Sequence, residues 1–192
     1  MRHVGSGQLP GSRHRLSKLP GSVGSVWRGR ASCATVWASR SLPIMDPAAA
    51  LHIRSHYSLL RAAWSVPCIV EAVGDAGFGA AALTDWASLA GAVEFWTLMR
   101  KAGRHPVLGC EFPVQHPSCA GSMVLLVEND IGYTNLCRML TQAATAGPPR
   151  LAGLAGKVDG LIAMTGGKDG VLHGLMESGK PAEASRWMVA LA

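Results

Sequence analysis

Ala80-Ala81-Ala82-Leu83-Thr84-Asp85 and Pro106-Val107-Leu108-Gly109-Cys110-Glu111 are two short apolar segments that each end in an acid, and together they decide the fold. The segment between them, residues 88–101, has the apolar spacing of a helix. This order predicts a β–α–β unit whose parallel strands carry Asp85 and Glu111 at their carboxyl ends. Because parallel α/β folds build their sites at that end of the sheet, these two carboxylates could form half of a metal site.

The alternation of strands and helices continues along the chain. We expect strands at 50–55, 80–84, 106–109, 122–127 and 160–165, and helices at 65–76, 88–101, 131–146, 171–178 and 182–191. This pattern predicts a parallel sheet with right-handed crossovers, either open or part of a barrel. A complete barrel would need more strands than these. In the helix at 88–101 we expect Leu89, Val93, Trp96 and Met99 to face the core, and Tyr133 is likewise expected to be a core aromatic.

Composition predicts one globular domain preceded by a basic leader. The chain has 192 residues, of which 48% are apolar, and a formal net charge of +6. Residues 1–45 contain seven Lys or Arg and no acid, so residues 46–192 hold 11 basic and 12 acidic groups. The domain expected over 46–192 is therefore nearly neutral, and the positive charge does not mark it as a nucleic-acid-binding domain.

The leader, residues 1–45, is rich in Gly, Ser and Arg and has no helical or strand periodicity. We expect a disordered extension, which would not be translated if the true start is Met45. A transit peptide and a basic arm for nucleic acid are the alternatives. The sequence has no apolar stretch of transmembrane length, and its five cysteines include no Cys-x-x-Cys pair, which is typical of reduced thiols in a cytoplasmic protein.

Chemistry-bearing residues gather at the ends of the first three expected strands, namely His52, Asp85 and Glu111. Imidazole and carboxylate are ligands that zinc, manganese or iron accept, and a bound metal would activate water against a phosphate ester. Structural roles are the alternatives: a hydrogen-bonded histidine, an Asp85 that anchors a turn, or a Glu111 paired with Arg54 or Arg61. A second motif, residues 165–170, has the composition of a phosphate-binding turn but lacks the P-loop spacing, and we expect a plain strand-to-helix turn.

A family resemblance follows from several of these segments. Residues 51–60, Leu-His-Ile-Arg-Ser-His-Tyr-Ser-Leu-Leu, resemble the opening of the PHP (polymerase and histidinol phosphatase) domain. Residues 82–95 and 106–111 resemble its second and third motifs. Residues 125–140 and 160–166 are similar to the form found at the N-terminus of bacterial C-family DNA polymerases, the polymerase III alpha subunit and its error-prone relatives. The resemblance extends from about residue 50 to the end of the chain.

The resemblance implies a distorted parallel β/α barrel, here truncated before closure, so that 46–192 would be a PHP domain incomplete at its C-terminus. Active members bind metal ions at the strand ends and hydrolyse phosphoesters or act as proofreading exonucleases. His52 falls on the first His of the family's His-x-His and Arg54 on the second. Asp85 keeps the acid of Thr-Asp-His, Trp86 replaces its His, and Glu111 keeps the acid of the third motif. The family's later ligands lie partly beyond residue 192.

These departures predict the remnant of a metal site, formed by His52, Asp85 and Glu111. Arg54 is permanently cationic, so it would repel a metal ion and could neutralise the two acids in its place. Trp86 cannot coordinate a metal. We therefore assign no catalytic residue and no definite cofactor, with zinc, manganese and magnesium as the candidates.

The expected function is that of a PHP-domain fragment of a DNA polymerase III alpha subunit, inactive alone, whose parent is a DNA-directed DNA polymerase in replication or error-prone repair synthesis. Its expected partners are the remainder of the polymerase and the replication subunits, with DNA reached through the parent protein and no membrane involved. The alternatives are a stand-alone PHP-type metal-dependent phosphoesterase and a non-catalytic scaffold module for polymerase partners. The sequence leaves the replicative and error-prone branches open.

Overall fold

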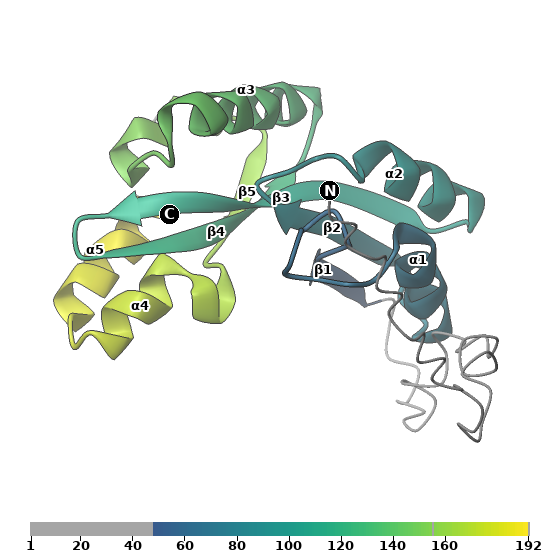
Figure 1. Cartoon of the computed structure of the whole chain (residues 1–192), viewed down its shortest axis with the longest axis horizontal. Helices are drawn as coiled ribbons and strands as arrows, with labels where there is room; N and C mark the ends of the chain where they lie inside the picture. Colours follow the sequence, from purple (N-terminus) through teal and green to yellow (C-terminus); the bar gives the residue numbers. More distant parts are fainter. Residues whose placement is uncertain (1–47, 155, 192) are drawn as a thin grey trace, which may run out of the picture. The chain divides into compact units, whose positions relative to one another are not determined.

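The computed structural model describes residues 48–154 and 156–191 (Figure 1). One five-stranded sheet has its strands in chain order: β1 (Ala49–Ile53), β2 (Ala80–Trp86), β3 (His105–His116), β4 (Cys119–Val127) and β5 (Leu161–Met164). The helices are α1 (Val66–Asp75), α2 (Ala92–Lys101), α3 (Asp130–Ala146), α4 (Val171–Glu177) and α5 (Pro181–Leu191), with short 3₁₀ turns η2 (Leu151–Leu154) and η3 (Gly167–Asp169). The predicted α/β class is confirmed. The expected leader, residues 1–45 with its alternative start at Met45, lies outside the described residues.

The predicted β–α–β unit is present. Strands β1, β2 and β3 are parallel, and β2 pairs with β3 in continuous register from Ala80 opposite His105 to Trp86 opposite Glu111. Helix α1, which connects β1 to β2, begins as predicted at Ser65, whose hydroxyl accepts a hydrogen bond from the backbone N–H of Cys68. The parallel strands therefore end side by side, which brings the residues that follow them to one edge of the sheet.

The fourth strand is not parallel, and the expectation of a uniformly parallel sheet is wrong at this point. Strand β3 continues past Gly109 to His116, and Pro117 and Ser118 alone connect it to an antiparallel β4. A two-residue connection can only reverse the chain, because a parallel crossover needs a dozen residues or more. Strand β5 is antiparallel to β4 and so runs in the direction of β3.

Pro113 lies within β3, although we expected a turn there. The carbonyl of Glu111 accepts a hydrogen bond from Ala87 on the β2 side, and alternation along the strand turns the nitrogen of Pro113 to that same side. Because β2 pairs with β3 only as far as Glu111, no strand among the described residues could accept a hydrogen bond from an N–H at position 113. The missing donor of proline therefore costs no sheet hydrogen bond.

Helix α2 begins later and faces the core differently from the expectation. Residues 88–91 form a turn, and the buried face of the helix carries Ala92, Phe95 and Met99. Val93 is 77% exposed and Trp96 is 45% exposed, while Tyr133 on α3 is 39% exposed. The apolar residues of 88–101 allow two stripes at helical spacing, and the one that contains Phe95 and Met99 is buried against β2 and β3.

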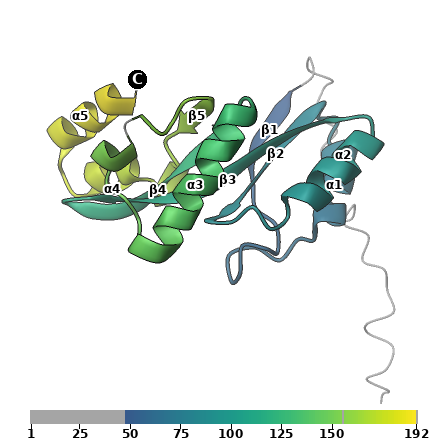
Figure 2. The ribbon, with the colours of Figure 1, turned by 90° about the horizontal axis from the view of Figure 1, so that it is seen from above.

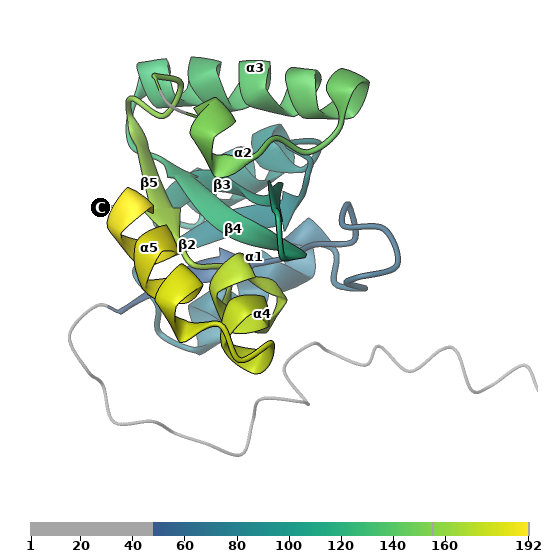
Figure 3. The same cartoon turned by 90° about the vertical axis from the view of Figure 1, so that its left-hand side faces the viewer.

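The core consists of clusters along the sheet. Helices α1 and α2 lie side by side and pack on the first three strands through Val66, Ile69, Phe95 and Met99 (Figures 1 and 2). A larger cluster joins the β3–β4 hairpin to α3, α4 and α5. Helix α3 lies on one side of this hairpin, and α4 and α5 lie on the other (Figures 1 and 3). Within the described residues, no helix is long and apolar enough to cross a membrane.

Candidate functional site

Asp85 and Glu111 end neighbouring strands, but they point to opposite faces of the sheet. Across the β2–β3 pair, Asp85 is the partner of Cys110, and Trp86 is the partner of Glu111. In-register neighbours of a parallel sheet share a face, and successive side chains alternate between faces. Asp85 therefore lies with Cys110 on the face covered by α2, whereas Glu111 and Trp86 share the other face. The sequence prediction that Asp85 and Glu111 form half of a metal site used only the proximity of the strand ends, and it did not include this alternation.

Glu111 is fully buried, and three side chains satisfy its carboxylate. Arg54 Nε donates to Oε2 at 2.5 Å, and the Nε2 atom of His52 lies 3.4 Å from the same oxygen. On the other side, the hydroxyl of Ser122 donates to Oε1 at 2.7 Å. His52 and Arg54 reach Glu111 because they are two residues apart at the end of β1 and so share a face, and Ser122 reaches it from β4.

The guanidinium of Arg54 joins Glu111 to a second acid. Its Nη2 donates to Oδ2 of Asp169 at 3.2 Å, and Lys168 Nζ lies 3.2 Å from the other carboxylate oxygen. Asp169 lies in η3, immediately after β5, so Arg54 links the end of the first strand to the turn after the last strand of the described sheet. We call Arg54, Glu111, Asp169, His52 and Ser122 the Arg54 network.

The two charged partners stabilise each other's ionised forms. Burial on its own would lower the pKa of Arg54, but the hydrogen bonds and charges of Glu111 and Asp169 raise it above its ordinary value. Burial on its own would raise the pKa of Glu111, but hydrogen bonds from His52, Arg54 and Ser122 and the charge of Arg54 lower it below its usual range. Glu111 is therefore an ionised carboxylate compensated by a permanent cation.

Asp85 has a different set of partners, all of them neutral. Its Oδ1 accepts the backbone N–H of Ser55 and the hydroxyl of Ser58, both at 2.6 Å, and its Oδ2 accepts the hydroxyl of Ser55 at 2.7 Å. Ser58 Oγ in turn accepts the backbone N–H of Trp86 at 2.9 Å. Asp85 thus anchors the loop that follows β1, which agrees with the structural alternative and not with a contact to Arg54.

Trp86 lies on the same face of the sheet as Glu111. It stands at the position of the His in the Thr-Asp-His motif that residues 84–86 resemble. The guanidinium of Arg61 stacks on its indole, with the Cζ atom 3.6 Å from the ring centroid. This second arginine also belongs to the loop after β1, and no ion pair joins it to Glu111 within the described residues. The strand end that would hold a further ligand is covered by an aromatic ring and a cation.

The described residues do not fit the metal ions that the family resemblance implies. No group of three or more His, Cys, Asp or Glu side chains within 48–154 and 156–191 is arranged to hold a metal ion. Zinc, manganese and magnesium all need deprotonated or neutral donors with free lone pairs. Here the carboxylate oxygens of Glu111 and Asp85 already accept hydrogen bonds, and a guanidinium lies against Glu111.

The structure thus brings together two of the three acids and imidazoles expected at the site. His52 and Glu111 meet, with Arg54, while Asp85 lies apart. Ser122 and Asp169 were missed. Ser122 shares the face of Glu111 because β4 is an antiparallel partner of β3, in which Glu111 pairs with Val124, two residues from Ser122. Asp169 belongs to the glycine-rich turn 165–170, whose close packing is shown by Gly166, where a Cβ would lie 2.5 Å from the carbonyl oxygen of Ser122.

Comparison with known proteins defines the class to which this fold and this site belong. The family model of the PHP domain matches residues 50–192. The chain therefore belongs to the PHP domain family.

The curated relatives are alpha subunits of DNA polymerase III and error-prone DNA polymerases. The chain is 36% identical over 149 residues to the DNA polymerase III subunit alpha of Caulobacter vibrioides, covering 70% of this chain and 13% of that protein. It is 33% identical over 149 residues to the error-prone DNA polymerase of Pseudomonas fluorescens, covering 75% and 13%. The chain thus spans only a small part of the length of these relatives.

Among solved structures, the chain is similar to a putative metal-dependent phosphoesterase from Bifidobacterium adolescentis. The TM-score is 0.44 and the sequence identity 17%, over 53% of this chain and 35% of that one.

Proposed function

We propose that this chain is the PHP domain of a bacterial C-family DNA polymerase alpha subunit and that it serves the polymerase as a scaffold without catalysis of its own. The observation that carries this proposal is the position of Arg54, whose guanidinium bridges the buried Glu111 and Asp169. A cation that joins two carboxylates is what a metal ion would supply at this edge of the sheet. Arg54 supplies it without a vacant coordination position for water or a phosphate ester.

Electrostatics favours this arrangement over a bound metal. Arg54 keeps its charge at every accessible pH, and a divalent ion about 4 Å from a unit positive charge is repelled by about 8 kcal/mol at an effective dielectric constant near 20. A divalent ion beside Glu111 would face this repulsion and would also have to displace the hydrogen bonds from Arg54 and Ser122. Arg54 therefore acts as the cation of this site, and His52 and Glu111 as the remnant of a metal site, whereas Asp85 lies on the other face of the sheet.

The names of the relatives support the parent function. They are DNA polymerase III subunit alpha and error-prone DNA polymerase, and each is much longer than this chain. The parent activity would be template-directed nucleotide addition in replication or error-prone repair synthesis. The partners would be the remainder of the polymerase and other replication subunits, in the cytoplasm, with DNA reached through them.

Metal analysis combined with a phosphatase assay tests the absence of catalysis. The purified chain is expected to contain zinc, manganese and iron well below one ion per chain and to leave p-nitrophenyl phosphate intact when manganese is added. Stoichiometric metal together with turnover would replace the scaffold by a metal-dependent phosphoesterase. The scaffold role is tested by copurification with the remainder of the Caulobacter vibrioides relative. No enrichment over an unrelated protein of equal size would contradict it.

A further inference from the structure

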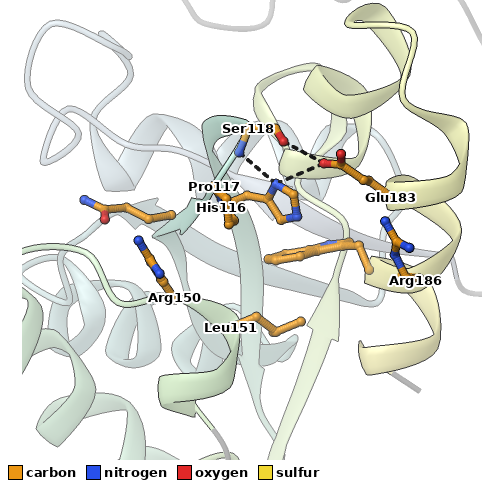
Figure 4. A pocket seen from close by; sticks show the side chains of 9 residues that line it. His116, Pro117, Ser118, Arg150, Leu151, Glu183 and Arg186 are labelled. Carbon is orange, nitrogen blue, oxygen red and sulfur yellow. Dashed lines mark hydrogen bonds and ion pairs between the residues drawn. The ribbon is translucent and has the colours of Figure 1, made fainter.

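A pocket of about 520 Å³ lies between the β3–β4 hairpin, η2 and α5, and the Arg54 network has no residue in it (Figure 4). Its lining comes from three stretches of the chain: residues 115–118, residues 150–151, and Glu183, Arg186 and Trp187 of α5. A volume of this size is within the range of small-molecule sites, which is about 300–1,000 Å³. The pocket is therefore large enough for a ligand of the size of a mononucleotide.

Two arginines give the pocket an uncompensated positive charge. Arg150 and Arg186 lie on opposite sides of the ring of His116 (Figure 4). Both are exposed, and neither guanidinium forms an ion pair or a hydrogen bond with any described residue. The acid of the pocket, Glu183, is already occupied, because its Oε2 accepts the hydroxyl of Ser118 at 2.6 Å and Lys180 Nζ lies 3.6 Å from its Oε1. The free cations therefore outnumber the free anions.

The other wall of the pocket is apolar and fixed in place. Trp187 is 5% exposed and packs in the core, with its ring edge-on to the ring of His116 at a centroid distance of 5.8 Å. The backbone bridge between Gln115 and Arg150, with the hydrogen bond from Gln115 N to the Pro149 carbonyl at 2.9 Å, holds the start of η2 against the hairpin. Leu151 and Pro117 complete this wall. A preformed apolar wall beside free donors is typical of a site for a ring that carries an anionic group.

His116 also lines the pocket, and its Nδ1 lies 3.9 Å from Oε2 of Glu183. This Nδ1 accepts the backbone N–H of Ser118 at 3.2 Å, so in the neutral ring the proton is carried by Nε2. Guanidinium groups bind phosphate through paired N–H donors. This geometry suits a phosphate group better than it suits an anion with a single acceptor atom.

We propose that this pocket binds a small organic phosphate, in which a phosphate monoester is joined to a flat ring system as in a mononucleotide. The phosphate would lie between Arg150 and Arg186, and the ring would lie against Leu151, Pro117 and the edge of Trp187. A free nucleotide and the 5′-phosphorylated end of a nucleic-acid strand share this chemistry.

Isothermal titration of the full chain with dAMP tests the proposal. One saturable site is expected, with inorganic phosphate and deoxyadenosine each bound at least about tenfold more weakly, because each lacks one half of the ligand. Arg150→Gln and Arg186→Gln should each weaken dAMP binding about tenfold. The matched control is Arg138→Gln, which removes an exposed arginine of α3 outside the pocket and should change nothing.

A comparison of dAMP with a 5′-phosphorylated oligonucleotide distinguishes a free nucleotide from a strand end as the ligand. A 5′-phosphorylated oligonucleotide that binds more tightly than dAMP would identify a strand end, and one that binds more weakly would identify the free nucleotide. The proposal is overturned if dAMP shows no saturable binding, if inorganic phosphate binds equally well, or if Arg138→Gln weakens binding as much as the two pocket variants. Thermal unfolding by circular dichroism verifies that all three variants are folded.

Discussion

Replacement of Arg54 by methionine should destabilise the domain strongly, because it leaves the charge of Glu111 buried. Methionine keeps most of the side-chain volume and removes the guanidinium, which forms the 2.5 Å contact to Oε2 and the 3.2 Å contact to Asp169. Glu111 is fully buried, and removing one partner of a buried ion pair costs about 3–5 kcal/mol. His52 and Ser122 still contact the carboxylate, so we expect the lower end, about 3 kcal/mol.

Urea unfolding measures this loss. With an m-value of about 2 kcal/mol/M, a loss of about 3 kcal/mol moves the midpoint down by about 1.5 M. The control is Arg138→Met on the exposed face of α3, which should change the free energy of unfolding by less than about 0.5 kcal/mol. The double variant Arg54→Met with Glu111→Gln should be more stable than Arg54→Met alone, because the unpaired charge is gone. A loss below about 1 kcal/mol in Arg54→Met, or no recovery in the double variant, would show that Arg54 does not compensate a buried charge on Glu111.

Three further predictions concern acid stability, the Asp85 anchor and close packing. The pKa of Glu111 is lower in the folded chain than in the unfolded one. Its contribution to stability is therefore present above about pH 4.3 and is lost as the pH falls through the folded pKa. Urea midpoints measured from pH 6 to pH 2 should fall less steeply in Glu111→Gln than in the wild type, and an unchanged slope would contradict the ion pair with Arg54. Ser58→Ala removes a 2.6 Å hydrogen bond to Asp85 and should cost about 2 kcal/mol in chemical unfolding. Ser185→Ala, which changes an exposed serine of α5, should be nearly neutral, and equal effects of the two variants would argue against the anchor. Gly109→Ala places a Cβ 2.6 Å from the carbonyl oxygen of Leu125 and should lower the thermal midpoint by the equivalent of about 1–3 kcal/mol. Gly153→Ala, whose Cβ would lie 3.7 Å from its nearest neighbour, should leave the midpoint unchanged. A neutral effect of Gly109→Ala would show that the two strands do not approach so closely.

Local patterns predicted the elements of this fold better than their directions. Ser65 as the N-cap of α1 and the two apolar segments that became β2 and β3 follow from propensity and periodicity, which act within a few residues. The reversal at Pro117-Ser118 was missed because β4 is as apolar as a parallel strand, so that only the length of the connection shows its direction. The outward position of Trp96 depends on which of two stripes packs better against β2 and β3, and the helix sequence alone does not contain this information.

The candidate site was predictable to the extent that it depends on strand ends. The sequence left two arginine partners open for Glu111, Arg54 and Arg61, and the structure shows the contact with Arg54. Arg54 comes directly after β1, and Glu111 is the last residue of β3 that pairs with β2. The separation of Asp85 from Glu111 follows from alternation, once the register between β2 and β3 is known. Asp169 is 115 residues from Arg54 in the sequence, and their contact exists only when β5 has joined the sheet.

Titration of the wild-type chain with zinc and manganese, followed by calorimetry, shows whether Arg54 acts as the cation of this site. We expect no saturable binding at micromolar concentration. Arg54→His, which places a neutral imidazole near His52 and Glu111, should increase the affinity. Stoichiometric binding to the wild-type chain that is abolished by Glu111→Gln would rule out this role of Arg54, because the metal would then occupy the position assigned to the guanidinium.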